Sequence, residues 1–309
     1  MTKDVEKENV VHVNDFMPLE GQWKLHNNVI TYSGPIDKNT PGHFGLVLFR
    51  YTLKNGSIKA KINFKERCYA RLVIGYDPRT KEYYSIGIGG YNYFYIIDKF
   101  EEGKGWRALQ FSGLNQIIDE NRIYEVEVNL EGQKVTLIID GVTIFNFLLP
   151  EPLNGIQTGL FAWGDGKVEF SDITIDKTED KAKAFVIMQF SEPSKSLYEE
   201  VIINICKEMN LFVYKADEIY KPGFILNDII WGILSSEIII ADITPENANV
   251  FYELGYAHAF NKPTILLAQR GTPLPFDVSG YRVIFYDDSI KGKREIEEQL
   301  RKHLKNIIK

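Results

Sequence analysis

The sequence Ile238-Ile-Ile-Ala-Asp-Ile-Thr-Pro-Glu-Asn-Ala-Asn-Val-Phe-Tyr-Glu-Leu-Gly-Tyr-Ala-His-Ala259 decides the fold of the second half of the chain. Its apolar, β-branched opening predicts a buried strand over 238–240. After a polar turn, Val250, Leu254 and Ala257 recur at helical spacing and predict a buried stripe. Glu253 lies beside this stripe, near the expected helix start and just beyond the strand, where ligands bind in open parallel sheets.

Strand-like and helix-like segments alternate on both sides of this stretch. The apolar runs predict further strands over 183–190, 211–214, 264–268 and 282–286. The helical spacing of apolar residues predicts helices over 194–209, 224–235 and 290–307. Because strands alternate with helices, we expect crossover connections and a flavodoxin-like parallel sheet in an α/β domain over residues 183–309.

The first half of the chain, residues 1–178, has the pattern of an all-β domain. Apolar and polar residues alternate over 45–51, 56–64, 70–76, 83–88, 93–97, 124–130, 134–139 and 168–175. Turn residues such as Asn55-Gly56, Gly132 and Asp140-Gly141 separate these runs. Many short strands with Gly-rich turns predict a β-sandwich. The charged segment 177–183 then links the two expected domains.

Composition describes an ordinary globular protein with two domains. The chain has 309 residues, 44% hydrophobic and 25% charged, with a net charge of −6. A negative net charge disfavours nucleic acid and anionic membranes as partners. Cys68 and Cys206 give no disulfide framework and no zinc spacing. Because the sequence lacks a long apolar segment and an apolar signal peptide, we expect a cytoplasmic location.

Polar residues at the predicted strand ends and on the two following helices form the candidate site. No phosphate-binding loop, HExxH or GxSxG motif appears in the sequence, and no metal site is expected. Glu253 and Asp228 are the candidate catalytic residues. The candidate substrate-binding residues are Gln189, Asp217, Asn227, Asp242, Asn247, Asn249 and Tyr256.

The C-terminal half resembles the nucleoside 2-deoxyribosyltransferase-like superfamily, and in particular its bacterial TIR-like branch. The resemblance spans about residues 183–287. It rests on 185–190, 216–219, Asn227-Asp-Ile-Ile-Trp-Gly-Ile233, 241–244 and Asn249-Val-Phe-Tyr-Glu-Leu-Gly-Tyr-Ala-His-Ala259, followed by Lys262-Pro263. It implies that Glu253 is the nucleophile and that Asp228 orients the sugar and Glu253. The helix dipole is expected to keep Glu253 ionised at neutral pH.

One position departs from the transferases, which carry an Asp six residues before the nucleophile. Asn247 occupies this position, and an amide cannot act as a general acid or base. Nicotinamide leaves NAD⁺ without needing a proton, so this departure favours NAD⁺ as the substrate. NAD⁺ is expected as a substrate, and no cofactor is expected.

The N-terminal half, about residues 20–178, resembles the concanavalin A-like (laminin-G-like) jelly rolls in its pattern of strands. Its aromatic residues either form a face for a carbohydrate or protein ligand or fill the sandwich core, and the core is the commoner use. They are Tyr83, Tyr84, Tyr91, Tyr93, Phe94, Tyr95 and Trp106. Because the paired carboxylates of the related glucanases are missing, we do not expect glycoside hydrolysis.

We therefore expect an enzyme that cleaves an N-glycosidic bond, with a small-molecule nucleotide as its partner and a homo-oligomeric state. The resemblance further implies a bacterial effector that acts against phage. Two alternatives stay open: a nucleoside deoxyribosyltransferase or N-glycosidase, and a non-catalytic nucleotide sensor with a lectin-like domain.

Overall fold

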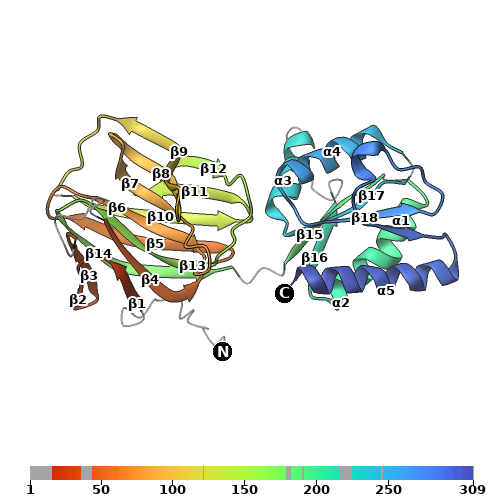
Figure 1. The fold of residues 1–309 in the computed structure, drawn as a ribbon, viewed down its shortest axis with the longest axis horizontal. Helices are drawn as coiled ribbons and strands as arrows, with labels where there is room; N and C mark the ends of the chain where they lie inside the picture. Colours follow the sequence, from red (N-terminus) through yellow and green to blue (C-terminus); the bar gives the residue numbers. More distant parts are fainter. Residues whose placement is uncertain are drawn as a thin grey trace, which may run out of the picture. The chain divides into compact units, whose positions relative to one another are not determined.

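The computed structural model describes residues 16–35, 44–120, 122–178, 182–189, 191–215, 225–244 and 246–308. Within this part of the chain the fold divides into two compact units, and the main division falls between residues 179 and 180 (Figure 1). The first unit contains antiparallel sheets, and the second contains a parallel sheet with helices.

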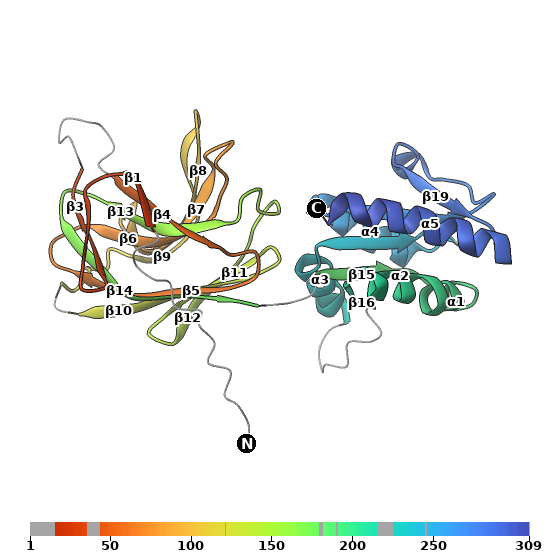
Figure 2. The same ribbon diagram turned by 90° about the horizontal axis from the view of Figure 1, so that it is seen from below.

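The N-terminal unit is a jelly-roll-like sandwich of two seven-stranded antiparallel sheets, which Figure 2 shows one above the other. The first sheet has the spatial order β1 (Phe16–Glu20), β4 (Phe44–Thr52), β13 (Gln157–Trp163), β6 (Tyr69–Tyr76), β7 (Tyr83–Gly90), β8 (Tyr93–Glu101) and β9 (Gly105–Leu114). The second has the order β12 (Val142–Leu148), β11 (Lys134–Ile139), β10 (Ile123–Glu131), β5 (Gly56–Phe64), β14 (Lys167–Lys177), β3 (Val29–Ser33) and β2 (Trp23–His26).

The core of the sandwich lies between the two sheets. Val47 and Leu72 from the first sheet and Ile58 and Val126 from the second are fully buried in one cluster. They alternate along their strands with residues that point away from this core, as the period of two in the sequence predicts. The strand and sandwich predictions are therefore confirmed for this half of the chain.

The hairpin turn between β11 and β12 illustrates how local sequence sets the strand register. Asp140 and Gly141 both have positive φ, at 50° and 78°. Two consecutive residues with positive φ define the turn whose twist matches that of paired strands, and Asp-Gly is among its favoured sequences. The turn therefore fixes the pairing of Ile139 with Val142.

The aromatic residues of the sandwich divide between the two uses that the sequence left open. Tyr83, Tyr84 and Phe94 are buried. Tyr91 is exposed in the turn before β8, and Tyr93, the first residue of β8, is half-buried. Tyr95 and Trp106 are partly buried and pack against hydrophobic clusters. Five of the seven rings therefore serve packing, which is the interpretation that strand propensity favours.

The C-terminal unit is a three-layer α/β domain with a five-stranded parallel sheet. Its strands have the spatial order β16 (Phe212–Lys215), β15 (Lys183–Ile187), β17 (Ile238–Asp242), β18 (Thr264–Gln269) and β19 (Val283–Tyr286). Counted from the first strand of this domain, the order is 2-1-3-4-5. The second strand therefore lies on one side of β15 and the later strands lie on the other, so the strand order reverses between β15 and β17.

Helices cover both faces of this sheet (Figure 1). One face carries α5 (Ile290–Ile307) and a helical segment made of α1 (Ser194–Leu197), η1 (Tyr198–Ile202) and α2 (Ile203–Glu208). The middle piece, η1, is a π-helical stretch within this otherwise α-helical segment. The other face carries α3 (Ile225–Ser235) and α4 (Ala248–Ala259).

The predicted buried stripe of α4 is confirmed. Val250, Leu254 and Ala257 are buried in the cluster that joins α3 and α4 to the sheet. Two such clusters, one on each face, explain why the strands read as continuous apolar runs in the sequence. No helix in the described ranges is long and apolar enough to cross a bilayer.

Candidate functional site

A pocket lies at the carboxyl ends of β15 and β17, beside the N-terminal turns of α3 and α4. Its volume is about 670 Å³. Its lining residues are Met188, Gln189, Leu226, Ile229, Asn247, Asn249, Val250, Tyr252 and Glu253. Because the strand order reverses between β15 and β17, this is the position at which open α/β sheets bind ligands.

Glu253 is the acidic residue among the described residues that line this pocket, and its pKa is unusual. Burial raises the pKa of its carboxyl to about 7. Among the described residues, no side chain donates a hydrogen bond to Glu253 or forms an ion pair with it. An unpaired carboxyl with a raised pKa in a pocket is a common mark of a functional site.

The helix dipole does not keep Glu253 ionised, and that prediction is wrong. Asn247 is the N-cap of α4, so Glu253 lies in the second turn of the helix. The influence of the dipole falls off within the first turn, whereas desolvation acts directly on the carboxyl group. Desolvation is therefore the larger effect, and the pKa moves up instead of down.

Asn247 connects α4 to the end of the first strand of the domain. Its Oδ1 accepts a hydrogen bond from the backbone N–H of Asn249 at 2.9 Å. Its Nδ2 donates to Oε1 of Gln189 at 3.3 Å, and Nε2 of Gln189 donates to Ser191 at 2.6 Å. The structure therefore brings Gln189, Asn247, Asn249 and Glu253 to one pocket, as the topology predicted.

Asp242 belongs to a buried network, and it does not line the pocket. Its carboxylate accepts hydrogen bonds from the Thr244 backbone at 3.2 Å, from Tyr286 at 3.1 Å and from Ser194 at 3.3 Å. Burial raises the pKa of Asp242 to about 7, although these hydrogen bonds oppose the rise. This placement corrects the expectation that Asp242 contacts the substrate directly: its side chain holds the turn beneath the site.

Asp228 and Tyr256 are not among the residues that line the pocket. Asp228 is half-buried in the first turn of α3, between Leu226 and Ile229, which line the pocket, and it is not itself a lining residue. Asn227 belongs to the same turn. Asp217 lies outside the described residues. Tyr256 packs against the helix-sheet cluster and does not line the pocket.

Sequence reasoning did not include Tyr252 among the site residues, although it lines the pocket. The hydroxyl group of Tyr252 donates to that of Tyr256 at 3.3 Å, and the two ring centroids are 5.1 Å apart. Leu226 and Ile229 were also missed. Their helical spacing of three places both on one face of α3, and this spacing was available in the sequence.

Lys262, in the Lys-Pro motif after α4, has a structural position. Its Nζ is buried and donates to the carbonyl of Leu234 at 2.6 Å and to that of Ser236 at 2.9 Å. Burial lowers the pKa of this amine to about 8. The ammonium group therefore satisfies carbonyls at and just beyond the end of α3 and anchors that end to the start of β18.

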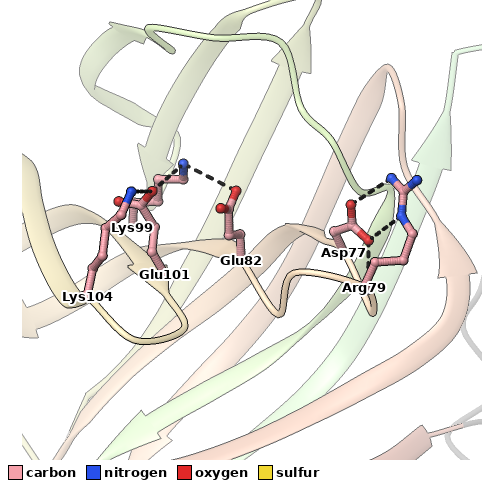
Figure 3. Close-up of polar contacts among 6 residues, drawn as sticks. All are labelled: Asp77, Arg79, Glu82, Lys99, Glu101 and Lys104. Atoms are coloured by element: carbon pink, nitrogen blue, oxygen red, sulfur yellow. Dashed lines mark hydrogen bonds and ion pairs between the residues drawn. The ribbon is translucent and has the colours of Figure 1, made fainter.

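Carboxylates at one end of the sandwich are engaged in ion pairs (Figure 3). Lys99 lies 3.4 Å from Glu82 and 3.3 Å from Glu101, and Arg79 lies 2.9 Å from Asp77. Glu125 and Glu127 both pair with Lys59. Within the described part of the chain, no group of three or more His, Cys, Asp or Glu residues could hold a metal ion.

No family model matches this sequence, and no curated protein matches it. Several solved structures are similar to about half of the chain. The carbohydrate-binding module CBM66 from Bacillus subtilis has 17% identity and a TM-score of 0.44, over 52% of this chain and 95% of its own. A Bacillus subtilis protein of unknown function with a galectin-like fold has 12% identity and a TM-score of 0.42, over 54% and 93%. A prokaryotic β-1,3-1,4-glucanase from a mouse hindgut metagenome has 8% identity and a TM-score of 0.40, over 52% and 92%.

Proposed function

We propose that the C-terminal domain cleaves the N-glycosidic bond of a nucleotide, that NAD⁺ is its substrate, and that Glu253 supplies the reacting carboxylate. The observation that carries this proposal is the pocket that gathers Glu253, Gln189, Asn247 and Asn249. Its volume of about 670 Å³ lies within the ~300–1,000 Å³ of typical small-molecule sites. The resemblance of 249–259 to the deoxyribosyltransferase-like and TIR-like domains supports the choice of bond.

The proposed reaction breaks the bond between the anomeric carbon and the base nitrogen, and the electron pair leaves with the base. The ionised carboxylate of Glu253 stabilises the developing positive charge, or forms an ester to the same carbon. Water then adds to the anomeric carbon and gives up one proton. This step regenerates the carboxylate of Glu253.

The amides of the pocket favour a leaving group that departs without a proton. Asn247 and Gln189 can donate and accept hydrogen bonds to sugar hydroxyls, but neither exchanges a proton at neutral pH. Nicotinamide is cationic when attached to the ribose and neutral once released. NAD⁺ therefore suits a pocket whose described lining contains Glu253 as its acidic residue.

The ring of Tyr252 would provide an aromatic surface for the planar base. Tyr252 lies on α4, is half exposed at 52%, and lines the pocket. Aromatic rings stack on planar ligands at little cost in conformational freedom. The strand order 2-1-3-4-5, which is that of flavodoxin-like sheets, supports a nucleotide site at this edge.

The test is incubation of the full chain with NAD⁺ and with a panel of nucleosides, followed by identification of the products by mass spectrometry. The proposal predicts nicotinamide and ADP-ribose from NAD⁺. Transfer of the sugar to an added base would instead identify a transferase. Calorimetric binding of NAD⁺ without any product would overturn the enzymatic proposal in favour of a sensor.

A further inference from the structure

A second pocket lies in the N-terminal sandwich, where β6, β7 and β8 meet the segment that follows β9. Its volume is about 370 Å³. Its lining residues are Arg67, Tyr69, Gly89, Asn92, Tyr93, Phe94, Asn115, Gln116, Ile117, Ile118 and Glu120. This pocket is formed entirely within the sandwich and shares no residue with the site that contains Glu253.

Five hydrogen-bonding side chains line this pocket. They are Arg67, Asn92, Asn115, Gln116 and Glu120. Among the described residues, none of these five side chains makes a hydrogen bond or an ion pair. By contrast, the carboxylates shown in Figure 3 are paired with lysine or arginine. The lining therefore offers both donors and acceptors that are available to a ligand.

The backbone holds two of these side chains in defined positions. Asn92 and Asn115 both have positive φ, at 67° and 56°. The N–H of Asn115 donates to the carbonyl of Asn92 at 2.9 Å, which ties the β7–β8 turn to the end of β9. The two amide side chains are thus presented from connected loops.

An aromatic ring is packed closely onto the strand at the same place. A Cβ atom at Gly89 would lie 2.1 Å from Cδ1 of Tyr69, so the ring lies directly over the Gly89 backbone. Tyr69 and Tyr93 add aromatic surface to the polar lining. Aromatic rings with a polar rim suit ligands that have both apolar faces and hydroxyl edges.

We propose that this pocket binds an uncharged saccharide, as a free sugar or as the end of a glycan. Sugar hydroxyls donate and accept, so they can satisfy amides, a guanidinium group and a carboxylate together. The charges of Arg67 and Glu120 offset each other, which disfavours a phosphorylated or acidic ligand. A purely apolar ligand would bury the five polar side chains without partners, which costs free energy.

The test is isothermal titration calorimetry of the full chain with glucose, galactose, mannose, fructose, N-acetylglucosamine and the β-linked disaccharides of glucose and galactose. The proposal predicts binding of at least one sugar. Gln116→Ala and Glu120→Ala should each weaken that binding about three- to tenfold, because each removes one hydrogen-bonding group. Both residues are exposed, so neither change should affect folding.

Matched controls separate this site from the rest of the molecule. Thr143→Ala on β12 and Glu151→Ala alter exposed positions outside this pocket and should bind the sugar as the wild type does. Glu253→Gln should also bind it normally, so failure of the proposed enzymatic activity would not affect this result. Absence of binding across the panel, or unchanged binding by both pocket variants, would overturn the proposal.

Discussion

At the scale of single residues, Glu253 has a carboxyl group that changes its protonation state near neutral pH. Burial places its pKa at about 7. The same carboxyl in a solvated first turn would be ionised throughout the neutral range. The pocket therefore makes ionisation of Glu253 sensitive to pH in the range where the protein would work.

The rate of NAD⁺ cleavage should rise as the pH increases through about 7, because only the ionised carboxylate can stabilise the cationic transition state. The measurement is the rate of nicotinamide release between pH 5 and pH 9 at limiting NAD⁺, which reports groups of the free enzyme. A rate that falls over this range would mean that the protonated form reacts.

Glu253→Gln should stabilise the protein at pH 8. The folded-state pKa is raised above its ordinary value, so the folded state binds more protons and loses stability as the pH rises toward about 7. The destabilisation that comes from ionising the buried carboxyl of Glu253 is fully present at pH 8 and absent at pH 4. After allowance for partial solvent exposure, removing it should raise the free energy of unfolding by about 1 kcal/mol.

Urea denaturation of both proteins at pH 8 and pH 4 measures this difference. Asp242, whose pKa is also raised, is present in both proteins, so its effect cancels. Equal free energies of unfolding at pH 8 would show that the carboxyl of Glu253 is well solvated, and would contradict the raised pKa.

At the scale of elements, Gly232 on α3 and Gly255 on α4 differ in how closely their backbones are packed. A Cβ atom at Gly232 on α3 would lie 2.3 Å from the ring of Phe185 on β15, whereas one at Gly255 on α4 would meet nothing within 4 Å. Gly232 therefore allows α3 to approach the sheet. Gly255 has no such packing role.

Gly232→Ala should lower the free energy of unfolding by about 1–3 kcal/mol, because the extra methyl group forces the buried ring of Phe185 to move. Gly255→Ala should raise it by up to about 1 kcal/mol, because Ala favours a helix more than Gly does. Chemical denaturation of the two variants measures both effects. If Gly232→Ala left the free energy of unfolding unchanged, α3 would not be packed against the sheet as closely as described.

Asn247→Ala should lower the free energy of unfolding by about 1 kcal/mol, because α4 loses its N-cap. Asn247→Asp is the matched control, since a carboxylate also caps a helix and is favoured at its N-terminus. Thermal denaturation of the two variants compares them. If the alanine variant were as stable as the aspartate variant, the cap would contribute nothing.

The sequence predicts the central strands well and the edge strands poorly, for a physical reason. Apolar alternation gives β5 and β11 with their observed bounds. The strands without a prediction include the outermost strands of the two sheets, β1, β2, β9 and β12, and two inner strands, β3 and β13. An edge strand has one neighbour and more solvent, so fewer of its residues need to be apolar.

The candidate site was predictable in position but not in detail. Strand ends correctly indicated where Gln189, Asn247 and Glu253 converge. Asp242 was misplaced because it follows Ile238 and Ile240 at a spacing of two, and so shares their face of β17, away from α4. The pKa of Glu253 depends on burial by residues from several segments of the chain, and the sequence motif around Glu253 does not show this burial.

At the scale of the whole molecule, the chain combines two units with separate pockets and different chemistry. The sandwich pocket offers unpaired amides and aromatic rings, and the α/β pocket contains a buried carboxyl group. Each pocket is formed within its own unit, so each activity can be tested by variants that leave the other site intact.

The central claim is that Glu253 carries out the cleavage. The most direct test is nicotinamide release from NAD⁺ at pH 8 by the full-length wild type, by Glu253→Gln and by Glu246→Gln, which changes an exposed glutamate just before α4. We predict that Glu253→Gln loses at least about a hundredfold in rate, as expected for removal of a group that stabilises the transition state, while Glu246→Gln retains the wild-type rate. Equal rates for the wild type and Glu253→Gln would contradict the claim.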